Sequence, residues 1–394
     1  MRRYPATFLL LAALAAAARA DTILVVPLSN LTAKPSVDWI GESAAESITE
    51  ALTREGLLVV DREDRKEGER RLALRPNARW TRASLIRLAE ALDADRVIFG
   101  AFEIGPGTHS PSMGLLKLSV QTINVRDLRP GGSFYESGPI EELAALQSHL
   151  AWQVLTNSAP KSAPSEEQFR LARTDIRLDA VENYVRGLLA QSPDAQERFF
   201  QQALKLDARY SQAAFQYGRM LFLKNNPASA ALQLEKVKNW DPHYRMANFL
   251  LGIAKFRQND FRASEAAFQR VVREVPLSEV FNNLGAAQLR LGMPEAIENL
   301  RRALEGDEKN PIYHYNLGLA LLARGAYPEA AEQFRATLDR DPKDQEATKL
   351  LGRSLRPQLG GVAREDLQGL ERLKLEYEEA AYQQLKALVA PQKK

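Results

Sequence analysis

Side chains that could support catalysis or metal binding are scattered through this sequence rather than grouped. Its four histidines are His109, His149, His243 and His314. None has a second metal-ligating residue at a spacing that a helix or turn would bring together. Acid pairs such as Glu141-Glu142 and Glu378-Glu379 point in different directions on a helix. The sequence also lacks a GxxxxGK[ST] phosphate loop and a GxSxG nucleophile elbow, so nothing indicates an enzyme, a metal site or a cofactor.

The first twenty residues, MRRYPATFLLLAALAAAARA, have the three-part pattern of a secretory signal peptide. Two arginines precede an apolar run that is too short for a transmembrane helix, and Ala-Arg-Ala closes the stretch. We expect cleavage after Ala20 and export to the periplasm or another extracytoplasmic compartment. An uncleaved membrane anchor is the alternative. After cleavage we expect no stable membrane insertion, because no later stretch approaches a spanning length.

The charge balance argues against a nucleic-acid partner. The chain has 53 basic and 50 acidic side chains, but Arg2, Arg3 and Arg19 lie in the signal, which leaves 53 − 3 = 50 of each sign. Nucleic-acid binding normally needs lysine and arginine clustered on one face. The chain has no cysteine, so its stability must come from burial of apolar surface rather than from disulfides. A cysteine for lipid attachment near the cleavage site is also absent.

Residues 21–156 alternate between strand and helix patterns, which predicts an α/β domain. The run ILVV after Thr22 suits a strand covered on both faces, and residues 37–53 carry apolar side chains every four positions, as on a helix. A second strand (57–61), a helix (82–92) and a third strand (96–102) follow. The next segment, 116–125, alternates as a strand does, and 139–155 forms a closing helix. We expect a mixed sheet with helices.

The motifs of this region resemble a known domain. The stretches ILVVPLSNL, VDWIGESAAESITEALTREGLLVVDRED and IRLAEALDADRVIFGAFE are similar to the amino-terminal domain of the periplasmic protein TolB and to related domains of curli-secretion and flagellar accessory proteins. The resemblance covers residues 21–155. It implies a compact envelope domain that docks to other proteins, without catalytic residues. An unrelated α/β domain is the alternative. Nothing downstream suggests the β-propeller of TolB itself.

A second region begins after residues 157–174, which are rich in Ser, Ala and Pro at their start and predict a linker. A glycine then recurs at 33- or 34-residue intervals. The positions are Gly218, Gly252, Gly285, Gly318 and Gly352, in frames such as NNLGAAQ and YNLGLAL. Small, aromatic and proline residues follow at fixed offsets, as in Ala330, Phe334 and Pro342. This pattern resembles the tetratricopeptide repeat (TPR), a pair of antiparallel helices, and implies an all-α superhelix, or α-solenoid.

The spacing has a packing cause. Gly318 and Ala330 are small because two helices cross closely there, and Pro342 cannot continue the second helix. We count five helix pairs within residues 175–356, starting near Asp179, Ser211, Arg245, Leu277 and Pro311, and a half unit through Leu355. Residues 357–394 are predicted as a carboxy-terminal capping helix, because apolar residues from Leu367 to Leu388 share one helical face. A partner-binding coiled coil is the alternative for this helix.

The resemblance also implies a binding surface. In tetratricopeptide repeats, positions two before and one or four to five after the recurring glycine commonly face a concave groove. Here these positions are Arg219, Phe222, Phe256, Arg257, Asn283, Arg290, Asn316 and Arg353. Asparagine can pair with the backbone of an extended peptide, and arginine can hold a carboxylate. We therefore expect a groove for an extended, acidic or carboxyl-terminal segment of another protein.

These observations predict a non-enzymatic, exported scaffold that binds envelope or secreted proteins through its repeats and its α/β domain. Two linked modules raise the effective concentration of a partner that touches both. The alternative is a ligand-responsive sensor, whose α/β domain would bind a small molecule beside the loop from Gly105 to Gly114. A hydrolase with an unfamiliar site is a third hypothesis, but no nucleophile and base can be named for it.

Overall fold

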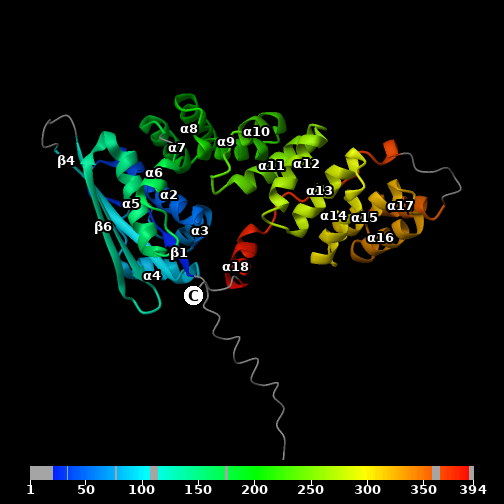
Figure 1. Cartoon of the computed structure of the whole chain (residues 1–394), viewed down its shortest axis with the longest axis horizontal. Coiled ribbons are helices and arrows are strands. Elements are labelled where there is room, and N and C mark those ends of the chain that lie inside the picture. The colour runs from blue at the N-terminus through cyan, green and yellow to red at the C-terminus, as the bar shows by residue number, and fades with distance from the viewer. Residues whose placement is uncertain are drawn as a thin grey trace, which may run out of the picture. The chain divides into compact units, whose positions relative to one another are not determined.

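The computed structural model describes residues 21–32, 34–75, 78–106, 114–173, 176–356 and 364–389. The predicted signal peptide, residues 1–20, lies outside this range. The chain divides into two compact units: one ends at Tyr210 and also takes in the residues from Gln383 onward, and the other is Ser211–Tyr382. Figure 1 shows an α/β region followed by helices, which confirms the predicted fold class.

A mixed six-stranded sheet forms the centre of the first unit. Its main order is β3 (Leu58–Val59), β1 (Thr22–Val25), β4 (Arg96–Gly105), β5 (Leu115–Asn124) and β6 (Pro130–Pro139), and β2 (Ser29–Asn30) pairs with β4. β1 runs parallel to β3 and β4, so helices must cross between these strands. β5 and β6 follow as antiparallel neighbours, which need only short turns.

Helices cover the sheet because its first strands are apolar on both faces. They are α2 (Trp39–Arg54), α3 (Arg62–Arg71), α4 (Arg82–Ala91) and α5 (Leu143–Ser158), with short 3-10 turns η2 (Pro35–Val37) and η3 (Ile140–Glu142). Leu24 and Val97 pack with Leu88 of α4. Their strand neighbours Ile23 and Ile98 point to the opposite face and are equally buried. The continuous apolar run after Thr22 follows from this two-sided burial.

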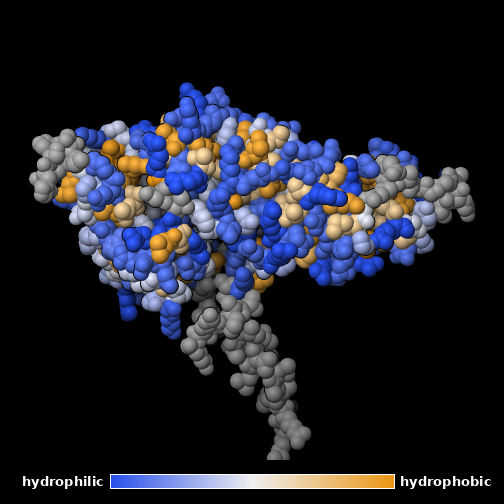
Figure 2. Space-filling model, turned by 45° about the horizontal axis from the view of Figure 1, so that its top comes forward, coloured by the Kyte–Doolittle hydropathy of each residue, from blue (hydrophilic) through white to orange (hydrophobic). Residues whose placement is uncertain are grey.

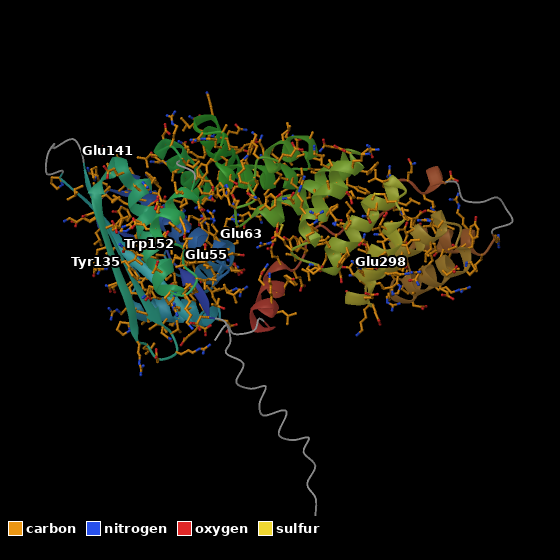
Figure 3. The ribbon with its side chains drawn as sticks, viewed as in Figure 1. Glu55, Glu63, Tyr135, Glu141, Trp152 and Glu298 are labelled. Atoms are coloured by element: carbon orange, nitrogen blue, oxygen red, sulfur yellow. The ribbon has the colours of Figure 1, made fainter. Side chains whose placement is uncertain are left out.

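The described part of the segment predicted as a linker, residues 157–173 of 157–174, is packed against the α/β region. It contains a short helix, α6 (Glu166–Leu171), on which Phe169 is buried. The Trp152 indole of α5 (Figure 3) donates a hydrogen bond to the Pro164 carbonyl at 3.0 Å. The Arg173 guanidinium donates to the carbonyl of Ser47 on α2 at 3.2 Å. The described part of this segment is therefore held by α2 and α5.

The helices from α7 to α16 form consecutive packed pairs, and α17 follows them as a single helix. The pairs are α7 (Leu178–Leu189) with α8 (Pro193–Leu206), α9 (Ser211–Leu223) with α10 (Pro227–Leu234), α11 (Tyr244–Arg257) with α12 (Phe261–Val272), α13 (Ser278–Leu291) with α14 (Glu295–Gly306), and α15 (Pro311–Ala323) with α16 (Tyr327–Arg340); α17 (Gln345–Ser354) follows. A Cβ on Gly252 would lie 2.6 Å from Cε1 of Phe268. The recurring glycine thus permits the close crossing that the spacing predicts.

The prediction of one continuous carboxy-terminal helix is wrong. A 3-10 turn, η5 (Arg364–Leu367), precedes residues 368–378, which have no helix, and a helix begins only at α18 (Glu379–Val389). Leu367 and Tyr377 are buried, whereas Leu375 is exposed. The apolar spacing that suggested a helical face instead serves contacts of an extended chain with the repeats.

Candidate functional site: the groove of the repeats and its occupant

The first helices of successive pairs form a surface on which part of the chain itself lies. Residues 368–378, named here the tail segment, run back along α17, α15, α13 and α11 within the second unit (Figure 1, orange to red). Each of these helices supplies a side chain that contacts the tail segment or the residues that flank it. The contacts show which chemistry this surface can bind.

Asparagines on α13 and α15 hold the backbone of the tail segment. Asn316 donates from Nδ2 to the Arg372 carbonyl (2.7 Å) and accepts the Arg372 N–H at Oδ1 (3.0 Å). Asn283 makes the same pair of bonds to Lys374, both at 2.8 Å. Asn282 adds a bond to the Arg372 carbonyl (3.0 Å). All three asparagines are buried, so these bonds are shielded from water, and they recognise backbone rather than any particular side chain.

The Arg372 side chain is enclosed by a carboxylate and an aromatic ring. Asp344, the N-cap of α17, accepts from the Arg372 guanidinium, including a bond of 2.9 Å to Nη2. That hydrogen bond lowers the pKa of Asp344 below its usual value. The guanidinium also lies 3.5 Å from the centre of the Tyr315 ring, an arrangement that attracts a cation. Burial of Tyr315 raises the pKa of its phenol to about 12, so this hydroxyl stays protonated.

A second charged contact lies one residue earlier in the tail segment. The carboxylate of Glu371 approaches Arg290 of α13 at 3.4 Å, and only 2% of the Glu371 side chain is exposed. Burial raises the pKa of Glu371 despite the neighbouring arginine. Arg290 in turn lies over the Phe261 ring, 4.1 Å from its centre. The groove therefore holds a buried acidic side chain beside Arg290, whose attraction offsets only part of the cost of burial.

The other end of the tail segment is held by an aromatic contact. Tyr377 packs against Phe249 of α11, with ring centres 4.7 Å apart. Its hydroxyl bonds to Glu379, which also pairs with Arg245 at the start of α11. Burial is the main cause that raises the pKa of Tyr377. An aromatic side chain five residues after Arg372 is thus part of the arrangement.

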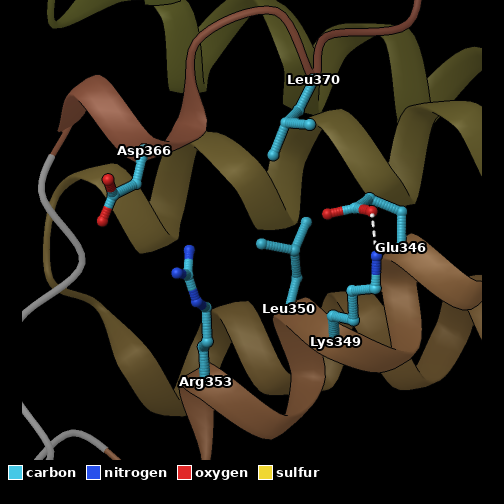
Figure 4. A pocket seen from close by; sticks show the side chains of 6 residues that line it. All are labelled: Glu346, Lys349, Leu350, Arg353, Asp366 and Leu370. Atoms are coloured by element: carbon cyan, nitrogen blue, oxygen red, sulfur yellow. Dashed lines mark hydrogen bonds and ion pairs between the residues drawn. The ribbon is translucent and has the colours of Figure 1, made fainter.

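A pocket of about 360 Å³ lies beside the start of the tail segment, between α17 and residues 366–370. Figure 4 shows its lining, with Glu346, Lys349, Leu350 and Arg353 from α17 and Asp366 and Leu370 from the opposite side. Lys349 pairs with Glu346 at 3.2 Å. The pocket therefore offers room for one more side chain next to charges of both signs.

The predicted groove residues fall into two connected groups. Asn283, Arg290 and Asn316 contact the tail segment, and Arg353 lines the pocket beside it. The other four lie on α9 and α11. The Arg257 guanidinium is 5.0 Å from the Phe222 ring centre, and Phe256 packs on Phe261, the ring that Arg290 covers. Arg219, on α9, also takes part in side-chain interactions.

Several groove residues were not identified from the sequence. Asn282, Tyr315, Asp344, Phe249 and Arg245 all contact the tail segment or its ends. Asn282 and Asp344 lie outside the positions two before and one or four to five after the recurring glycine, so the repeat pattern does not mark them. Their role depends on the extended course of residues 368–378, which a capping helix over 357–394 does not predict.

The histidines form local contacts. His149 lies 2.6 Å from Glu136, His243 stacks on Phe215, and His314 contacts Gln333 at 2.8 Å. His109 lies outside the described residues, as do residues 107–113 of the loop considered for a small ligand. Within the described ranges, no group of three or more His, Cys, Asp or Glu side chains could hold a metal. In the same ranges, no helix combines the length and apolar character needed to cross a membrane.

Comparison with known proteins identifies the repeats. Residues 189–243, 249–294 and 293–345 match the tetratricopeptide repeat family model. Among solved structures, the chain is similar to YrrB, described as a TPR protein with an unusual peptide-binding site (20% identity, 48% of this chain and 90% of that one, TM-score 0.35). It is also similar to MamA from Desulfovibrio magneticus (19%, 43% and 99%, 0.38) and to a thermophilic TPR protein from Thermus thermophilus (19%, 45% and 98%, 0.32). No curated protein matches the chain.

Proposed function

We propose that the tetratricopeptide repeats of this chain bind an extended segment of another protein, and that the chain is a non-enzymatic scaffold. One observation carries the proposal: Asn316 and Asn283 each pair with both the N–H and the C=O of one residue in an extended strand. Such contacts recognise the main chain, while neighbouring pockets select side chains. Tetratricopeptide repeat proteins as a class are protein-interaction scaffolds.

The polar groove indicates a partner-binding site more clearly than the exposed surface does. On the face shown in Figure 2, hydrophobic residues lie in groups among hydrophilic ones. Scattered exposed apolar side chains such as Leu223 and Leu232 are ordinary in folded proteins. By contrast, the buried asparagines Asn282, Asn283 and Asn316 form a specific site for the backbone of an extended peptide. Arg290 and Asp344 add charged contacts to the side chains of the same segment. We therefore place partner binding in the groove of α11, α13, α15 and α17.

Selection from a displayed library of random peptides tests this proposal. We expect the full chain with Glu371→Lys and Tyr377→Ser, which weaken the hold of the tail segment on the same asparagines, to enrich groove-binding peptides. These peptides should lose binding when Asn283→Ala and Asn316→Ala are added, because the backbone bonds would then be missing. Asn183→Ala is the matched control, since Asn183 lies on α7, outside the groove, and donates to the Asp179 carbonyl of the same helix at 2.7 Å. Peptides that bind both variants equally would place the interaction elsewhere and would refute the groove.

We further propose that the scaffold is exported and works in assembly of a cell-envelope complex. The support is the signal-like composition of residues 1–20 and the likeness of residues 21–155 to the TolB amino-terminal domain. In this proposal the α/β domain supplies a second protein contact. A fusion of residues 1–32 to a reporter that is active only outside the cytoplasm should be active, with Asp21 as the new amino terminus. An inactive, uncleaved fusion would refute export.

A further inference from the structure

We propose that the tail segment is a resident ligand of the groove: a partner carries the same recognition features and binds by displacing residues 368–378. This inference rests on the proposed function and makes it more specific. The features are a carboxylate at the position of Glu371, a cation at that of Arg372 and an aromatic ring at that of Tyr377. A segment of the form Glu-Arg-x-Lys-x-x-Tyr has all three.

The side-chain features follow from separate contacts. The carboxylate position faces Arg290, and the next position lies between Asp344 and the Tyr315 ring. Lys374 has its Nζ 5.4 Å from the centre of the Tyr313 ring, which favours a second cation. The intervening residues are less restricted, since Leu375 is 52% exposed. The groove thus reads a carboxylate, then two cations, and then an aromatic anchor.

The same contacts explain why the tail segment can be exchanged. Its central bonds reach its backbone, so any extended chain can replace them without loss. Large apolar burial is confined to Leu367 and Tyr377 near its ends, and water can hydrate the groove asparagines once the segment leaves. Binding is intramolecular, however, so the effective concentration of the tail is high. A partner can bind only while the groove is empty. The apparent affinity for a partner is therefore the intrinsic affinity multiplied by the fraction of molecules whose tail segment has left the groove.

Fluorescence anisotropy with a labelled peptide of residues 366–380 tests the inference on the full chain. The release variant combines Glu371→Lys with Tyr377→Ser, which removes two side-chain contacts from the tail and leaves the groove intact. The matched control combines Glu376→Lys with Leu375→Ser at exposed positions of the same segment. We expect the release variant to bind the peptide at least about tenfold more tightly than wild type or control, because competition is weakened.

Specificity is tested with the release variant and altered peptides. Alanine in place of Glu371 or Tyr377 in the peptide should weaken binding at least about fivefold, since each loses one of the three features. Adding Asn283→Ala and Asn316→Ala to the release variant should abolish most binding. Equal affinity for the original and altered peptides would overturn the proposed ligand class.

The outcomes separate this inference from the proposed function. Equal peptide affinity of wild type, control and release variant, with loss on asparagine replacement, overturns the resident ligand but keeps the groove as a binding site. No binding to any of them overturns the inference, while the selected peptides still decide the proposed function. If the release variant does not fold, hydrogen exchange of wild type with an isotope-labelled peptide replaces it. Residues 371–378 should exchange faster as the peptide is added, and unchanged exchange would refute displacement.

Discussion

At the scale of single residues, the α/β region depends on a buried charge cluster. Glu42 of α2 is 3% exposed and accepts from Arg65, also 3% exposed, at 2.6 Å, and from Arg62 at 2.6 Å. Burial alone would raise the pKa of Glu42, but the two arginines outweigh it and lower the pKa to about 2. Loss of one partner of a buried ion pair leaves an uncompensated charge.

Glu42→Gln should therefore destabilise the protein by about 3–5 kcal/mol. Because the pKa of Glu42 is lower in the folded chain, its stabilisation is complete above about pH 4.5 and is lost as pH falls toward 2. The melting temperature of wild type should fall more than that of Glu42→Gln across this range. The control Glu63→Gln (Figure 3) alters an exposed carboxylate at the start of α3 and should cost less than about 1 kcal/mol. Parallel pH profiles for wild type and Glu42→Gln would contradict the account.

The asparagines show what sequence can predict at this scale. Asn283 and Asn316 follow from their fixed offset to the recurring glycine, and their amides suit peptide backbone. Asn282 and Asp344 lie outside that offset, and only the course of the tail segment gives them a role. A residue whose function depends on a distant part of the chain carries little local signal.

At the scale of elements, the recurring glycine has different surroundings in different repeats. Gly252 lies against the Phe268 ring, whereas a Cβ on Gly352 of α17 would meet nothing within 4 Å. The same substitution should then have opposite effects. Gly252→Ala should destabilise by about 1–3 kcal/mol through overpacking. Gly352→Ala should stabilise by about 0.5–1 kcal/mol through helix propensity.

Urea unfolding of both variants measures this difference. A shift of the same sign in both would show that the glycine acts through helix propensity alone, and would contradict the packing explanation. The helix pairs themselves could be predicted from sequence because a glycine and an aromatic residue sixteen positions later report one local crossing, as in Gly252 with Phe268. The extended course of the tail segment could not, because Leu367 and Leu370 have helical spacing but pack into the apolar cluster of the repeats. Tertiary contacts decide its conformation.

At the scale of the whole molecule, the boundary between the two compact units does not coincide with the change in amino-acid composition along the chain. The Ser- and Pro-rich start of residues 157–174 suggested a boundary, yet α7 and α8 belong to the same unit as the sheet. Arg62 of α3 donates to the Leu188 carbonyl at the end of α7 at 2.6 Å. The first helix pair thus joins the α/β region, and Ser211 begins the repeats that carry the groove.

The central claim is that the groove binds extended backbone through its asparagines. Isothermal titration calorimetry of a library-selected peptide tests it most directly, in the release variant, because the tail segment uses the same asparagines. The titrations compare the release variant with the release variant that also carries Asn283→Ala and Asn316→Ala. With a net contribution of about 1 kcal/mol for each asparagine, the Kd of the second variant should be roughly thirtyfold weaker. Unchanged melting temperature and peptide affinity in the second variant would contradict the claim.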